Sequence, residues 1–157
     1  MERRLSWEEY VVFLKGSFLS WMKLRSSREK ICYGVYNSGV LSIEVYIEIL
    51  NKSSRFSKDE IRRMLNRFCA IKGVGPVLAS AMITVINPDK YGIVSKYTIK
   101  ALNSYKLREY SFNNRNIDGV VEVIEEMRAI QSKVNKTSKK HYSVRNVDMA
   151  LWGYGNV

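Results

Sequence analysis

Residues 69–81 read CAIKGVGPVLASA and carry the strongest structural signal in the chain. Gly73 and Gly75 permit main-chain conformations that a side chain would hinder, so they predict a tight turn. Pro76 suits the first residue of a helix, because it has no N–H group to leave unpaired there. Ala79 is small enough to let two helices approach closely. The stretch therefore predicts two helices joined by a short glycine turn.

Helical patterns continue on both sides of this turn, and no convincing strand is found. Ser57 with Glu60 forms a capping box that opens the helix leading into the turn, and Ser95 can cap a helix to about Tyr105. Further helices are expected from Ser6 to about Met22, over about 28–37, from Ile43 to Leu50, from Val120 to Val134 and, after a polar connector at 135–142, from Ser143 to Trp152. The prediction is an all-α fold, one compact helical domain over residues 1–157, with the helical hairpin at about 57–87.

Composition excludes several classes of protein. The 157 residues are 46% hydrophobic, too apolar for a disordered polycation. Two cysteines and one histidine cannot supply a disulfide framework or a structural zinc site. No apolar run reaches the length of a membrane span, and the N-terminus shows no signal-peptide pattern. We expect a basic, soluble, cytoplasmic protein whose partner is a polyanion.

The formal net charge of +11 is unevenly distributed along the chain. Residues 51–72 carry seven basic and two acidic side chains, and residues 133–145 carry five basic and no acidic ones. The segment 118–126 is acidic instead. Segregation of this kind is typical of a nucleic-acid-binding face, although lysine-rich faces are also often just solvated.

The glycine turn has the chemistry of a phosphate site. The first turn of the helix after it presents unpaired N–H groups at the positive end of the helix dipole. Lys72 lies at the tip, and Arg63 and Arg67 lie on the preceding helix. Such a corner binds phosphate without reading base sequence.

The turn resembles the helix-hairpin-helix motif, and residues 57–105 resemble the corresponding part of the helix-hairpin-helix DNA glycosylase superfamily. The resemblance implies double-stranded DNA, damaged or distorted, as the partner. It also implies a monovalent cation held by the main-chain carbonyls of Cys69, Ile71 and Val74. The residues expected to bind DNA are Lys72, Gly73, Val74, Gly75, Val77, Lys96, Arg63 and Arg67.

Two positions depart from the superfamily pattern. Ser95 stands where the resemblance implies the catalytic aspartate, and a neutral hydroxyl cannot supply the negative charge that the transition state needs. Val77 stands where the lyase branch carries a lysine, so no Schiff-base chemistry is expected there. The sequence therefore predicts a nucleoid-associated, sequence-independent DNA-binding protein of repair or damage recognition, with impaired or absent catalysis.

Two alternatives stay open. One is an active monofunctional glycosylase, either because Ser95 replaces a natural aspartate or because another carboxylate acts. The other is a helical protein-interaction module. The other carboxylates considered are Asp89 in a loop, Asp118, Glu122, Glu125 and Glu126 on a long acidic helix, where Glu122 and Glu126 share a face expected to be solvated, and Asp148, expected to pair with a helix dipole. Trp7, Trp21 and Trp152 are expected in the core, Cys69 as a buried thiol, and His141 in solvent or on a phosphate.

Overall fold

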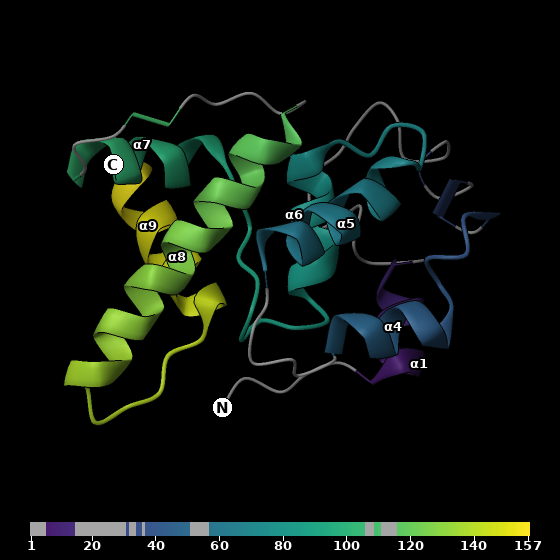
Figure 1. Ribbon diagram of the computed structural model, residues 1–157, viewed down its shortest axis with the longest axis horizontal. Helices are drawn as coiled ribbons and strands as arrows, with labels where there is room; N and C mark the ends of the chain where they lie inside the picture. Colours follow the sequence, from purple (N-terminus) through teal and green to yellow (C-terminus); the bar gives the residue numbers. More distant parts are fainter. Residues whose placement is uncertain are drawn as a thin grey trace.

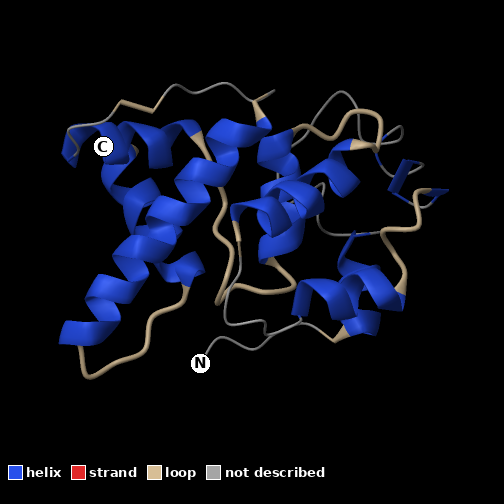
Figure 2. Ribbon diagram, in the orientation of Figure 1, coloured by secondary structure: helices blue, strands red, loops and turns tan. Residues whose placement is uncertain are grey.

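The structure is a computed structural model that describes residues 6–14, 31, 34–35, 37–50, 57–105, 109–110 and 116–157 (Figure 1). Within these residues all regular structure is helical and no strand occurs, as Figure 2 shows. The predicted all-α fold is therefore confirmed. None of the helices in this part of the chain is long and apolar enough to cross a membrane.

One side of the molecule is built from the helices of the first half of the chain (Figure 1). They are α1 (Trp7–Val12), α4 (Ile43–Leu50), α5 (Lys58–Cys69) and α6 (Pro76–Thr84). The predicted capping box begins α5, where the Ser57 hydroxyl accepts from the Glu60 N–H, and a capping box also begins α1, where the Ser6 hydroxyl accepts from the Glu9 N–H. Pro76 is the first residue of α6, as predicted.

The other side is built from α7 (Lys96–Tyr105), α8 (Ile117–Thr137) and α9 (Val144–Gly155). The long helix α8 crosses between the two sides, packing against α5 and α6 on one side and against α9 on the other (Figure 1). The predicted start of α9 is confirmed, because the Ser143 hydroxyl accepts from the Asn146 N–H at 3.0 Å. The predicted bounds of α7 are confirmed as well.

Apolar side chains of α5, α6 and α8 fill the centre of the molecule. Each is almost fully buried, and each such side chain contributes on the order of 1.5–3 kcal/mol to folding. The largest are Ile61, Leu65 and Phe68 on α5, Met82 and Ile83 on α6, and Ile124 and Met127 on α8. This core fixes the angle at which α5 and α6 meet, and so fixes the turn between them.

Residues 85–95, here called the crossing segment, run from α6 to α7 through the middle of the molecule (Figure 1). Helices from both sides of the molecule hold it by hydrogen bonds. From the first side, the Asn87 Nδ2 donates to the Ile49 carbonyl of α4 at 3.0 Å, and the Val94 N–H donates to the Ser80 hydroxyl of α6 at 3.2 Å. From the other side, the Arg145 N–H of α9 donates to the Pro88 carbonyl at 3.0 Å, and the Arg128 Nε of α8 donates to the Lys90 carbonyl at 2.8 Å. The crossing segment is thus a tightly bound part of the interior.

Some expectations need correction, and others concern residues that the structure does not describe. Helix α8 continues to Thr137, so the connector before α9 is shorter than predicted. Trp152 is 48% exposed rather than in the core, because α9 turns it outward beside Tyr97, where the two rings meet edge to face at 5.9 Å. Trp7 is half-buried. Trp21, and parts of the helices expected up to Met22 and over 28–37, lie outside the described residues.

Candidate nucleic-acid interface

The turn between α5 and α6 is anchored by apolar side chains and presents its tip to solvent. Ile71 and Val74 are buried, whereas Lys72 and Gly73 are exposed. The Val74 N–H donates to the Ile71 carbonyl at 3.0 Å and closes the turn. Gly73 has a φ of 89°, a left-handed conformation that disfavours any residue with a side chain. The left-handed main chain at position 73 is therefore the reason that the predicted turn requires a glycine there.

Ile31 and Gly34 also contact the turn, and the sequence did not predict these contacts. A Cβ atom at Gly73 would lie 3.0 Å from the Ile31 Cγ1, and one at Gly34 would lie 2.7 Å from the Ile71 Cγ2. Ile31 and Gly34 thus pack directly against the turn. Close main-chain packing of this kind holds the turn in one conformation before any partner arrives.

Helix α6 begins without a side-chain cap. Gly75 is its N-cap residue, with an extended main chain (φ −90°, ψ 171°), and it has no side chain to accept a hydrogen bond. Pro76 carries no N–H, so Val77 and Leu78 supply the N–H groups of the first turn. The Ala79 N–H is the first to bond within the helix, to the Gly75 carbonyl at 2.9 Å. The first turn of α6, at the positive end of its helix dipole, thus has no side-chain acceptor from its N-cap.

The two arginines expected to bind phosphate already share a carboxylate. Glu48 on α4 accepts from Arg63 at 2.8 Å and from Arg67 at 2.6 Å. The Arg63 and Arg67 side chains remain 59% and 40% exposed, so each keeps a solvent-facing surface. Since one carboxylate faces two guanidinium groups, the cluster retains one positive charge. Lys72 at the tip is exposed.

Ser95 uses its polar groups to begin α7. Its hydroxyl lies 2.7 Å from the Thr98 hydroxyl and accepts from the Thr98 N–H at 3.2 Å, while the Ser95 N–H donates to the Thr98 Oγ1 at 2.9 Å. The next residue, Lys96, is exposed, and its Nζ lies 4.8 Å from the centre of the Tyr97 ring. The capping role expected of Ser95 is confirmed, and no carboxylate occupies its position.

Asp148 serves the fold rather than a helix dipole, which corrects the expectation for it. It lies beyond the first turn of α9 and is 2% exposed. Its carboxylate pairs with Arg145 and accepts from the Ile93 N–H at 2.8 Å. A carboxylate so enclosed has no open face toward a substrate, and its partners explain why the aspartate is buried.

Most of the other carboxylates considered each contact a different basic or polar side chain. Asp118 pairs with Arg62 at 2.7 Å, Glu125 with Arg128 at 3.1 Å, and Glu126 accepts from the Tyr110 hydroxyl at 3.3 Å. The Asp89 Oδ1 lies 3.9 Å from the Nε2 of His141, which is exposed. Glu122, Glu125 and Glu126 are half-buried, so this face of α8 is less solvated than expected.

The main-chain carbonyls of Cys69, Ile71 and Val74 lie on the same short turn, and carbonyl oxygens suit a hard cation. The Ile71 oxygen already accepts from Val74, which leaves one of its lone pairs for a cation. Partial burial raises the pKa of the Cys69 thiol, so this side chain stays protonated at neutral pH. The residues described contain no cluster of three or more His, Cys, Asp or Glu side chains suited to a metal ion.

The sequence predicted Lys72, Gly73 and Gly75 on one turn, and they lie there, with Lys72 and Gly73 exposed and Gly75 half-buried. It did not indicate Glu48, whose pairing with Arg63 depends on how α4 packs against α5. Comparison of the chain with protein-family models, with curated proteins and with solved structures finds no match.

Proposed function

We propose that this chain binds double-stranded DNA through the α5–α6 turn without reading its base sequence. The observation that carries the proposal is that Lys72 and Gly73 are exposed beside the first turn of α6, which has no side-chain cap. A phosphate group can approach such a corner closely, because Gly73 and Gly75 present no side chain to block it. Contacts from main-chain N–H groups to phosphate carry no information about the bases.

The charges around the corner support a polyanion as the partner. Lys72 is exposed, the arginine pair around Glu48 keeps one net positive charge, and Lys96 at the start of α7 is exposed as well. Their attraction for phosphate is long-ranged at low salt and sequence-independent. The Gly73 turn is held by the core and by Ile31, so little order has to be gained on binding.

The same proposal includes a role in the repair or recognition of damaged or distorted DNA, with base excision impaired or absent. Ser95 brings no negative charge to its position, and Asp148 is enclosed by Arg145 and the Ile93 N–H. Neither is suited to stabilise a positively charged sugar. A protein with this activity acts on the chromosome, in the cytoplasm.

The test is duplex binding measured by fluorescence anisotropy over a range of salt concentrations. If about four phosphates are neutralised, the logarithm of affinity falls with the logarithm of salt at a slope near −3.6. Lys72→Glu is expected to weaken binding at least about tenfold, and equally for several unrelated duplex sequences.

Lys139→Glu is the matched control, because it makes the same change of charge at another exposed lysine, near the far end of α8. It is expected to weaken binding less than about threefold. A slope near zero, or an equal loss in both variants, would show that the turn is not the DNA site.

A further inference from the structure

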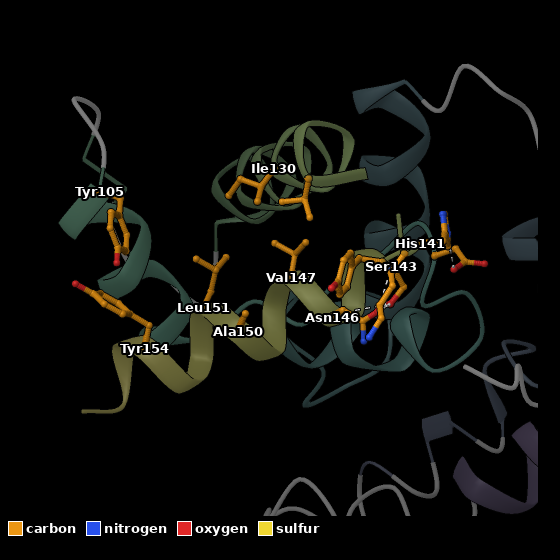
Figure 3. Close-up of a pocket in the computed structure, with 13 residues that line it drawn as sticks. Tyr105, Ile130, His141, Ser143, Asn146, Val147, Ala150, Leu151 and Tyr154 are labelled. Carbon is orange, nitrogen blue, oxygen red and sulfur yellow. Dashed lines mark hydrogen bonds and ion pairs between the residues drawn. The ribbon is translucent and has the colours of Figure 1, made fainter. Parts of the chain in front are cut away.

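A groove lies between α8 and α9 (Figure 3). Its volume is about 700 Å³. Ile130 and Val134 of α8 form one wall, and Val147 and Leu151 of α9 form the other. Its floor and walls are therefore apolar along most of its length.

The residues of α9 that line the groove form one continuous helical stripe. They are Ser143 at the N-cap, then Asn146, Val147, Ala150, Leu151 and Tyr154. Steps of three and four residues keep them on one face, and this face runs on the order of 16 Å at 1.5 Å per residue. On α8 the lining residues Ile130 and Val134 are also four apart. A groove lined by two such apolar stripes can receive the apolar face of a third helix.

Two tyrosines stand at one end of the groove and His141 at the other (Figure 3). The Tyr105 and Tyr154 rings lie 4.8 Å apart and are 67% and 51% exposed. Exposed aromatic rings beside an apolar groove are typical anchors of protein–protein interfaces. The groove is thus open to a partner along the length of α9.

The surroundings of the groove are strongly basic. Lys140 lines it, Lys139 precedes Lys140 in the connector, and Lys133 is next to Val134 on α8. These three lysines are exposed, and within the described part of the chain none has an ion-pair partner. Asp89 is the acidic residue that lines the groove, and its Oδ1 lies 3.9 Å from the His141 Nε2. Charge complementarity therefore favours an acidic occupant.

We propose that the groove between α8 and α9 binds an amphipathic, acidic helix of a partner protein. The apolar face of that helix packs between Val134 and Leu151, and its acidic residues face the lysines around Lys140. A second copy of this chain is a poorer occupant, since two copies that each carry a net charge of +11 repel one another. DNA is poorer as well, because the walls offer apolar side chains where phosphate needs donors.

The experiment uses three helix-stabilised peptides of about 12 residues, long enough to span the groove. All three share leucines at the spacing i, i+3, i+7 and i+10, and they differ only in carrying Glu, Gln or Lys elsewhere. Binding to the whole chain is measured by fluorescence anisotropy. At about 50 mM salt the Glu peptide is expected to bind at least about tenfold tighter than the Lys peptide, and the difference is expected to shrink as salt rises.

Two neighbouring substitutions on α9 locate the site. Ala150→Arg fills the groove and is expected to weaken the Glu peptide at least about tenfold, whereas Met149→Arg is expected to change it less than about twofold. Both residues are exposed, but only Ala150 lines the groove. The two variants add the same charge, so a general electrostatic effect cannot separate them. Circular dichroism checks that both fold.

The proposal is overturned by several results. One is the absence of saturable binding of the Glu peptide, and another is equal binding of all three peptides. Equal losses in Ala150→Arg and Met149→Arg would place the peptide elsewhere. Sedimentation that finds a dimer disrupted by Ala150→Arg alone would assign the groove to a second copy. Weaker binding of a DNA duplex in Ala150→Arg, with none in Met149→Arg, would assign it to nucleic acid.

Discussion

At the scale of single residues, Ser95 combines a confirmed structural role with a proposed chemical deficiency. Its hydroxyl caps α7 through Thr98, a role that an aspartate performs equally well. Ser95→Asp is therefore expected to fold, and Ser95→Ala to lose about 1 kcal/mol of unfolding free energy with the cap.

The chemical consequence of Ser95 follows from the proposed function. A missing electrostatic contact in the transition state typically costs about 10²–10³ in rate, so the natural chain is expected to excise bases very slowly or not at all. Ser95→Asp is expected to excise at least one base. The assay is strand cleavage after hot alkali on duplexes carrying uracil, mismatched thymine, alkylated purines or oxidised guanine, with Ser95→Ala as the uncharged control. Robust excision by the natural chain would contradict the proposed impairment.

Tyr10 is another residue whose environment has a measurable consequence. Its side chain is fully buried, and its hydroxyl has no hydrogen-bond partner among the described residues. Burial raises the pKa of Tyr10, and burial also raises the pKa of Tyr91. In the unfolded chain both phenols ionise near their ordinary pKa of about 10. The folded state therefore keeps its full stability below about pH 10 and loses it as the pH rises further.

Tyr10→Phe is expected to leave the unfolding free energy at pH 7 unchanged or about 1 kcal/mol higher, because it removes a buried polar group that has no partner. The loss of stability above about pH 10 is expected to become shallower, and shallower again when Tyr91→Phe is added. Urea unfolding at several pH values measures both effects. A large loss at pH 7 would show that the Tyr10 hydroxyl has a partner in the folded protein.

At the scale of elements, the contact between α7 and α9 depends on one glycine. A Cβ atom at Gly155 would overlap the Tyr97 carbonyl oxygen, whereas one at Gly153 would meet no atom within 4 Å. Both glycines lie in the last turn of α9. The pair therefore separates close packing from helix propensity within the same helix.

Gly155→Ala is expected to lower the unfolding free energy by about 1–3 kcal/mol, since main-chain atoms of α7 have to move. Gly153→Ala is expected to raise it by up to about 1 kcal/mol, because alanine favours helix over glycine. Thermal unfolding of the two variants beside the parent measures the difference. Equal effects in the two variants would mean that α9 does not approach α7 this closely.

Helix starts were predictable from the sequence, and contacts between distant helices were not. The caps at Ser57, Ser95 and Ser143 each depend on a partner three residues away, so a short stretch of sequence contains the whole interaction. The exposure of Trp152 depends instead on which face of α9 meets α7, which the apolar pattern of one helix does not settle. The pairing of Glu48 with α5 escaped prediction for the same reason.

At the scale of the whole molecule, the crossing segment joins the two sides, and Asp148 is one of its main supports. Its carboxylate holds Ile93 of that segment and Arg145 of its own helix. Asp148→Ala is expected to cost on the order of 3 kcal/mol, because it leaves a partly buried guanidinium and a main-chain N–H without their acceptor. Asp148→Asn is expected to cost less, since the amide oxygen can still accept from Ile93.

Chemical unfolding followed by circular dichroism and by tryptophan fluorescence measures this prediction. Both variants are expected to show coincident transitions by the two probes, since the crossing segment couples the two sides. A loss below about 0.5 kcal/mol in Asp148→Ala, typical of a surface substitution, would contradict the role assigned to this carboxylate.

Several of the residues that hold the crossing segment are synthesised well after the segment itself. Ile93 and Asp148 are 55 residues apart, and Lys90 and Arg128 are 38 apart. During synthesis the segment leaves the ribosome well before these anchors, while α5 and α6 can already pair with each other. A nascent chain can therefore form the glycine turn early, but its interior main chain stays exposed until α9 has been made. Over that interval a chaperone would recognise residues 85–95, rather than the helical hairpin.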